Sequence, residues 1–416
     1  MRKKLVILSL LISFFLCTGT VNQTYADNAE VLPKGVFRGS ITGNLYFAID
    51  KRFDPDGKEE DVAHDFNATL DSFVFPDLAL VEQAFGMPPG SANIGRSDVA
   101  FKYYFQDLII DFQYGLLDRL SVGVKIPYYW NKTKVNRALL DSSGATVGKN
   151  AALNTVAPLA FPGTVPLTTQ DAQNLIGPGL DINGDGNIDI KGFGYKRIKT
   201  WSDSGISDIE AGVRYQYLKT DRWRLAFTGG VRFPTGEVDD PDNLIDTSFG
   251  TGAWALLFRF NQDLFVMKNL LLNATFRYDL VLPDKRTKRI PNNVDQPITA
   301  NREKVHRNLG DVFELEASGS YEFLKGLSFS LLYRYAFKLK DHVSGHQNFA
   351  YESLEDETNW QYHIFETGLS YSTIPLYMAK KFILPLTASI SYKNVFAGKN
   401  NYLKQQLFSV NLAFYF

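Results

Sequence analysis

Charged residues of this chain recur at every second position in several segments, which would bring them together on one face of a strand. Opposite charges on facing strands form either a structural network of ion pairs or a water-filled path with binding groups. For any single residue the structural network is the simpler interpretation. For the whole set a hydrated interior follows either way, because unpaired charge in lipid is prohibitive. The candidate residues are Asp208, Glu210, Arg214, Arg232, Arg259, Arg277, Glu314, Glu316, Arg334 and Lys338.

A second group of oxygen ligands lies in a Gly- and Asn-rich segment. Five of its residues alternate around Gly186: Asp181, Asn183, Asp185, Asn187 and Asp189. This spacing is typical of Ca²⁺ loops, in which a glycine permits the sharp turn. Gly192 stands where an EF-hand carries its bidentate Glu, although Asp189 could supply the last carboxylate. An ordinary polar turn explains the same residues. Calcium in an external loop is therefore one expectation, and no other cofactor is required.

Local catalytic motifs of hydrolases, metalloproteases and P-loop proteins are absent from the sequence. His342 and His346 lie four residues apart, but Gly345 between them argues against a helix that presents both. An outer-membrane hydrolase would draw its catalytic groups from separate strands, so the missing motifs weaken that function without excluding it. We therefore assign no catalytic residue and expect no enzymatic activity.

The segments that carry these charges alternate apolar and polar residues over ten or more positions. Between residues 313 and 323 the apolar side chains fall on one face, and Glu314 and Glu316 fall on the other. Strands of soluble proteins commonly have about five or six residues, whereas about ten residues cross a bilayer at a tilt. Every backbone N–H and C=O must be paired in lipid, so a sheet survives there only as a closed barrel.

Connections of alternating length indicate the orientation of the strands. Short joints near residues 118, 221 and 325 and at Asp263–Lys268 are typical of periplasmic turns, and long polar segments are typical of external loops. The long segments are 51–97, 136–203, 237–247, 283–308 and 341–358. We expect one all-β domain over residues 27–416, a transmembrane antiparallel up-and-down β-barrel of about twelve strands, with ten or fourteen as alternatives. The expected strands are 35–49, 98–116, 120–135, 205–218, 223–236, 249–262, 269–282, 310–323, 327–340, 360–373, 382–395 and 403–416.

Two of the long segments carry expectations of their own. Residues 136–203 are rich in Gly, Asn and Pro, so packing across the barrel mouth, or a cation, is expected to order them in place of a core. Residues 76–89 could form a short amphipathic helix. That helix would either pack over the barrel rim or act as a lid or plug with an apolar side suited to an apolar ligand.

Both ends of the chain point to export to the outer membrane. Basic residues, an apolar run over 5–17 and a small residue at 26 are typical of a signal peptide, which we place at residues 1–26. Cys17, the only cysteine, falls inside it, and a lipoprotein or a retained anchor are the weaker alternatives. The last strand alternates aromatic residues up to Phe416, which resembles the signature that the outer-membrane assembly machinery recognises. That machinery, outer-membrane lipid and a small apolar solute are the expected partners, in the outer membrane of a Gram-negative cell.

Charge and composition exclude other classes. The net charge is −1 over the full chain, and removal of the basic signal peptide makes it more negative, so nucleic acid is not an expected partner. Aromatic residues make up 14% of the chain, which suits the aromatic girdles of a membrane barrel better than a soluble α/β enzyme.

The middle of the chain resembles the outer-membrane family of the MetA pathway of phenol degradation. Three short segments carry the resemblance over about residues 205–260: Gly205-Ile206-Ser207-Asp208, which runs on to Tyr215, then Phe233-Pro234-Thr235-Gly236, then Phe249-Gly250-Thr251-Gly252. The resemblance implies a barrel and, by analogy with channels for hydrophobic compounds, the uptake of aromatic or other apolar molecules. It supplies no catalytic residues.

Three functions follow as hypotheses. The first is an outer-membrane channel for small apolar or aromatic molecules, which diffuse passively through a charged lumen. The second is a closed structural or binding barrel whose long loops contact a partner, and the third is an outer-membrane hydrolase. Continuity of the lumen would separate the first two, and a Ser/His or Asp/His cluster at the outer rim would support the third.

Overall fold

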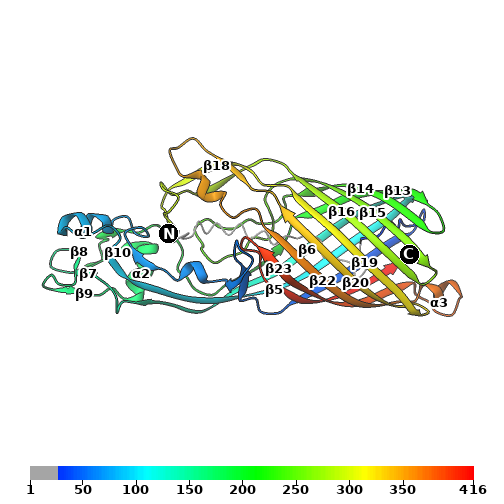
Figure 1. Cartoon of the computed structure of the whole chain (residues 1–416), viewed down its shortest axis with the longest axis horizontal. Helices are drawn as coiled ribbons and strands as arrows, with labels where there is room; N and C mark the ends of the chain where they lie inside the picture. Colours follow the sequence, from blue (N-terminus) through cyan, green and yellow to red (C-terminus); the bar gives the residue numbers. More distant parts are fainter. Residues whose placement is uncertain (1–26) are drawn as a thin grey trace.

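A closed antiparallel barrel dominates the computed structural model, which describes residues 27–416 (Figure 1). Neighbouring strands of the wall follow one another along the chain, and β24 pairs with β1 to close the ring. The wall has twelve strand positions, which confirms the predicted all-β up-and-down barrel. None of the helices in this part of the chain is long and apolar enough to cross a membrane.

The wall strands all overlap the segments predicted from alternation. Their bounds are β1 Phe37–Tyr46, β5 Asn93–Leu117, β6 Leu120–Asp141, β13 Ile209–Lys219, β14 Trp223–Phe233, β15 Ala255–Met267, β16 Leu270–Val281, β19 Val312–Leu324, β20 Leu327–Lys338, β22 Gln361–Ser372, β23 Leu386–Lys399 and β24 Gln406–Tyr415. The fourth wall position is shared, because β12 (Trp201–Ile206) pairs with the outer part of β6 and β13 continues below it. Short β4 (Thr69–Asp71) adds to the outer part of β5.

Several boundaries differ from the prediction: β5 and β6 extend beyond the expected 98–116 and 120–135, and the expected strand 205–218 is divided between β12 and β13. The turn expected at Asp263–Lys268 is strand, because β15 begins at Ala255 and turns only after Met267. Residues 249–254 stay outside the ladder, since Asp208 and Glu237 take up their backbone N–H groups. The last hairpin is also shifted: α3 (Ile374–Met378) occupies its turn, so β23 starts at Leu386.

The two faces of the wall have opposite chemistry, as the alternation predicted. Leu331 is 42% exposed on the outer face, whereas Arg334, three residues further along the same strand, is 3% exposed on the inner face. Near the long-loop end, outward aromatic rings stack from strand to strand: Phe258, Tyr278, Phe313 and Phe337, with centroids 4.8–5.9 Å apart. Such a row of rings is the girdle expected at a membrane interface.

Long connections gather at one end of the barrel, opposite the C-terminus (Figure 1). The first contains β2 (Lys51–Phe53), β3 (Glu59–Asp61), η1 (His64–Phe66), β4 and α1 (Leu78–Phe85). The second contains β7 (Val147–Asn150), β8 (Thr155–Pro158), β9 (Thr164–Val165), α2 (Thr169–Ile176), β10 (Gly179–Leu180) and β11 (Ile190–Lys191). Later loops carry β17 (Asp284–Arg289), β18 (Arg302–Asn308), β21 (His342–Ser344) and η2 (Tyr351–Leu354).

An external subdomain, which we define as residues 69–96 and 139–195, sits at the outer ends of β5 and β6, away from the short turn that joins them (Figure 1). These strands have 25 and 22 residues, about twice what a bilayer crossing needs. The subdomain has a core that includes Phe75, Leu78, Ile94, Val156 and Leu175. The expectation that residues 136–203 lack a core was therefore wrong. Both segments contribute to this core, which lies between them at the outer ends of β5 and β6.

The assignment of faces predicts unequal costs for one and the same substitution. Leu331→Arg puts a charge at mid-strand on the lipid side and should destabilise the membrane-inserted fold by about 2–4 kcal/mol. Leu324→Arg, which is a matched change at the exposed end of β19, should cost about 0–1 kcal/mol. Urea titration of folding into lipid vesicles measures both. Equal costs would mean that the outer face was assigned wrongly.

Candidate functional site

The lumen holds the N-terminal segment of the described chain, residues 27–32. It enters from the short-turn end, where Gly35 bonds to Gly115 of β5. Leu32 donates its N–H to Ser121 Oγ of β6 at 2.8 Å, and Ala29 donates its N–H to the carboxylate of Asp263 on β15 at 3.1 Å. Because these partners lie on separate parts of the wall, the segment crosses the interior at this level.

Asp27 is the charged centre of the lumen. It is 5% exposed, and its carboxylate pairs with Arg214 and lies 3.6 Å from Arg259 and 3.7 Å from Arg277. Its carbonyl oxygen accepts hydrogen bonds from Asn261, Asn273 and Thr275. The single residue is thus held by six side chains of the wall and by a seventh, Glu316, which accepts its N–H at 3.2 Å.

On one side of Asp27 the ion pairs continue over β13, β14 and β15. Glu210 lies 2.9 Å from Arg232 and 3.1 Å from Arg259, and Arg232 reaches Asp279 at 2.6 Å. All of these side chains are buried to more than four-fifths. Each charge has a counter-charge within hydrogen-bonding distance, which offsets the cost of removing it from water.

On the other side the network runs to β19 and β20. Glu316 lies 2.5 Å from Arg334, and Glu314 lies 3.5 Å from Arg277 and 3.7 Å from Arg334. Alternating charge therefore spans six neighbouring wall strands through Asp27. A small cavity of about 100 Å³ remains beside it, lined among others by Lys125, Glu210, Arg214 and Arg259.

The structure places all ten predicted lumen residues on the inner face, but in three separate groups. Eight belong to the network around Asp27: Glu210, Arg214, Arg232, Arg259, Arg277, Glu314, Glu316 and Arg334. Lys338 stands apart at the long-loop end, where it pairs with Asp341 and donates to the carbonyl of Thr358. Asp208 forms the third group by itself. Their role as a permeation path stays a prediction.

Asp208 joins the three segments that carried the family resemblance. Its carboxylate accepts N–H groups of Gly236 at 3.0 Å and of Thr251 at 2.8 Å. Thr235 donates its hydroxyl to the carbonyl of Ser207 at 2.8 Å. A β-carbon at Gly250 would lie 2.2 Å from the Asp208 carboxylate, so only glycine fits there. These motifs therefore close the break between β12 and β13, which is a structural role.

Sequence reasoning missed several residues of the lumen site, among them Asp27 and Asp263. Asp27 follows directly on the predicted signal peptide, and no local pattern shows that this segment returns into a lumen. Asp263 falls in a predicted turn, although it lies in phase with Arg259 and Asn261 on the inner face. The signal for Asp263 was therefore present as an alternation that continued past the expected strand end.

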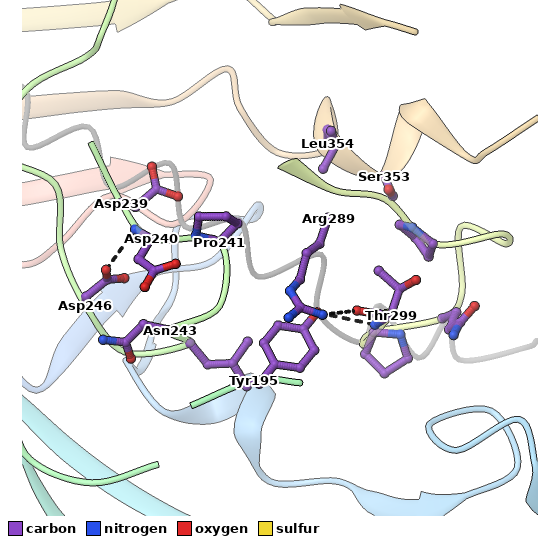
Figure 2. A pocket seen from close by; sticks show the side chains of 14 residues that line it. Tyr195, Asp239, Asp240, Pro241, Asn243, Asp246, Arg289, Thr299, Ser353 and Leu354 are labelled. Carbon is purple, nitrogen blue, oxygen red and sulfur yellow. Dashed lines mark hydrogen bonds between the residues drawn. The ribbon is translucent and has the colours of Figure 1, made fainter. Parts of the chain in front are cut away.

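Loops at the outer end are tied together by Arg289 (Figure 2). Its guanidinium donates to the carbonyls of Phe193, Gly194 and Thr299 at 2.6–2.9 Å and pairs with Asp242 at 2.8 Å. It also lies 3.9 Å above the ring centroid of Tyr195. One buried cation thus connects three long loops next to a small polar pocket.

That pocket contains a titratable group, Asp246. Burial raises the pKa of its carboxyl to about 7, and the nearby carboxylates of Asp239 and Asp240 contribute to the rise. The backbone N–H of Asp240, which donates to this carboxyl at 2.9 Å, acts in the opposite direction. The pKa in the ordered loop thus lies above the value of 3.8 for a free Asp. The ordered loop should therefore lose stability as the pH rises from about 4 to about 7.

We predict that residues 239–246 exchange backbone hydrogens faster at about pH 8 than at about pH 5.5, after correction for the intrinsic rates. Asp246→Asn keeps an oxygen for the N–H of Asp240 but removes the titration, so this variant should exchange equally at both values. A pH dependence that survives in Asp246→Asn would show that another group causes the effect.

The expected calcium ligands form a hydrogen-bonded turn in the external subdomain. Asp181 accepts N–H groups of Gly184 and Gly186 at 2.7 and 2.8 Å, Asp185 accepts that of Asn187 at 2.8 Å, and Asp189 accepts that of Ile182 at 2.8 Å. Within residues 27–416 no group of three Asp, Glu, His or Cys is arranged to hold a metal. These bonds order the loop by themselves, and calcium stays a prediction.

Calcium has a direct test in this loop. Binding without a bidentate twelfth ligand should be weak, with Kd of about 10⁻⁴–10⁻³ M. Millimolar Ca²⁺ should then slow proteolysis between Asp181 and Asp189, and Asp185→Ala should abolish the protection while the barrel stays folded. Identical cleavage with calcium and with chelator would leave an ordinary polar turn.

The histidines give no support to a hydrolase. His64 lies 3.8 Å from Glu60 and His342 lies 3.8 Å from Glu355, both in exposed loops. His306 packs against His346, and His363 bonds to the hydroxyl of Tyr333 on the outer face. None of these contacts pairs a histidine with a serine.

Solved structures of outer-membrane channels share this architecture. The COG4313 outer membrane channel from Pseudomonas putida F1 matches with a TM-score of 0.53 at 11% identity, over 95% of this chain and 100% of that chain. A TodX monoaromatic hydrocarbon channel mutant matches with a TM-score of 0.38 at 11% identity, over 92% of this chain and 91% of that one. The Ralstonia pickettii toluene transporter TbuX matches with a TM-score of 0.34 at 9% identity, over 92% of this chain and 90% of that one. The first match shows a shared fold, and the other two TM-scores are too low to support an argument.

Sequence comparison places the chain in a family. No curated protein matches it, but residues 141–402 match the family model described as "Putative MetA-pathway of phenol degradation". The match includes the three segments that meet at Asp208, and it extends well beyond the range of about 205–260 in which the resemblance was first seen. Because it covers more than half of the chain, this outer-membrane barrel belongs to the MetA-pathway phenol-degradation family.

Proposed function

We propose that this protein is an outer-membrane channel that admits small apolar or aromatic molecules by passive diffusion once residues 27–32 leave the lumen. The observation that carries the proposal is the way this segment is held. Its contacts with β6, β13, β15, β16 and β19 are hydrogen bonds and ion pairs. A segment bound in this way can be exchanged for water without breaking the ladder of the wall.

The emptied lumen would be hydrated, because the wall that the segment contacts is polar. Arg214, Arg259 and Arg277 would face the vacated space from β13, β15 and β16. Guanidinium groups attract the faces of aromatic rings. A small neutral aromatic with a polar group dissolves in water and would therefore pass such a path more easily than a long hydrocarbon.

The choice of solute rests on the family, whose description connects it with phenol degradation. The network around Asp27 does not select a solute by itself, because paired charges present no single binding charge. Selection by size fits better, and its limit would be set by the space that residues 27–32 vacate together with the cavity of about 100 Å³ beside them.

A closed binding barrel is the second candidate, and the same segment favours it. If residues 27–32 never leave, the lumen conducts nothing and the long loops carry the function. The external subdomain, with a core of its own, would then be the part that contacts a partner.

Conductance in planar bilayers separates the two candidates. A variant that lacks residues 27–32 behind the same signal should conduct several times more than the full mature chain, because its lumen is no longer crossed. Asp27→Ala should lie between them, since it removes the ion pairs of Arg214, Arg259 and Arg277 but keeps the backbone contacts.

The matched control removes the same number of residues, 183–188, from an exposed external turn and should leave conductance unchanged. Swelling of liposomes in phenol then reports the solute. Silence of both the full chain and the truncated variant would favour the closed binding barrel. Conductance without phenol permeation would keep the channel and reject the solute class.

A further inference from the structure

A cavity of about 340 Å³ lies in the external subdomain, away from the lumen. One wall is α1, and the others come from β8, from the end of α2 and from the segment after the Asp181–Asp189 turn. Most of its lining is aliphatic or aromatic, including Phe75, Leu78, Val81, Ile94, Val156 and Leu175. The proposed permeation path uses none of these residues.

The wall formed by α1 is held in place. Glu82, which is 5% exposed, accepts the N–H of Ala92 at 3.0 Å. The helix ends at Gly86 in the left-handed region (φ +62°), and Met87 returns its N–H to the carbonyl of Glu82 at 2.8 Å. A fixed helix cannot collapse into the space beside it, so the cavity is part of the folded subdomain.

Its rim differs in chemistry from its interior. Asp77, Asp189 and Lys191 stand at the edge, where water reaches their charges. Leu80 of α1 also lines the cavity and is 66% exposed, which marks an open side. An apolar interior with an exposed apolar lip and a few polar groups is the usual form of a small-molecule site.

A packing defect explains the cavity poorly. Native interiors pack as densely as organic crystals and contain few voids larger than a water molecule. An engineered apolar cavity of about 150 Å³ is already enough to bind benzene. The volume here exceeds that value and is at the small end of ligand pockets, which start at about 300 Å³.

We infer that this cavity binds an uncharged apolar molecule of one or two rings at the outer surface of the cell. The ligand is uncharged because no buried ion partner lines the interior, and it is compact because α1 limits the length. The inference deepens the proposed function, since the site would hold the class of molecule that the barrel is proposed to admit. Binding here nevertheless requires no conduction through the lumen.

Crystals of the full-length protein soaked in iodobenzene test the location directly. The anomalous signal of iodine should appear between α1 and β8. In solution, 4-fluorotoluene titrated into the protein in lipid nanodiscs should show a saturable ¹⁹F shift above that of empty nanodiscs. Val81→Trp, which fills the cavity from α1, should weaken this binding at least about tenfold.

Gln83→Trp is the matched control, because residue 83 is exposed on the same helix and does not line the cavity. Leu80→Asp is a second variant for the case that Val81→Trp misfolds. It lies at a position that is already exposed, and we expect it to weaken binding as well. Iodine sites confined to the membrane belt, or equal ¹⁹F titrations for Val81→Trp and Gln83→Trp, would overturn the inference. Binding without any conductance would keep this site and reject the channel.

Discussion

Charge inside a narrow barrel must be paired, because a filled lumen solvates it poorly and lipid does not solvate it at all. In this protein the pairing depends on Asp27. Arg259 and Arg277 also pair with carboxylates of the wall, Glu210 and Glu314, whereas Arg214 pairs with Asp27. The positive charge of the wall is therefore balanced in part by a carboxylate that does not belong to any wall strand. This makes the N-terminal segment part of the interior and couples its position to the electrostatics of the lumen.

The same requirement for complete pairing explains the family motifs. Where β12 gives way to β13, the wall loses regular hydrogen bonds, and a buried backbone group without a partner is costly. The carboxylate of Asp208 accepts the N–H groups of Gly236 and Thr251. The hydroxyl of Thr235 donates to the carbonyl of Ser207 and accepts the N–H of Ile209. Glycine at 250 is required because the Asp208 carboxylate occupies the space of a side chain. The three motifs, which are separate in sequence, thus act together: they supply the hydrogen bonds that the wall lacks between β12 and β13.

Alternation was enough to predict the barrel, because the side-chain period of a strand is two and the lipid enforces it on every crossing. It was enough for the inner face as well, including the pairing partners Glu316 and Arg334. It failed where order comes from contacts distant in sequence. Asp27 reaches Glu316 across the lumen, and the core of the external subdomain joins Phe75 to Leu175 across the β5–β6 hairpin. Neither contact leaves a periodic trace in either segment. The end of β15 is the intermediate case, since Asp263 continued the alternation but resembled a turn residue.

A charged lumen and an apolar external pocket place opposite demands on one solute. An apolar surface gains about 25 cal/mol per Å² on leaving water, so a small ring prefers the pocket to the hydrated path. Net passage nevertheless requires binding that is weak enough for release. The open lip at Leu80 satisfies this, because a site that is not fully enclosed removes only part of the ring from water. The pocket also lies on the long β5–β6 hairpin rather than on the lumen axis. It would therefore raise the local concentration of solute near the mouth, and the polar interior, rather than the pocket, would set which solutes cross.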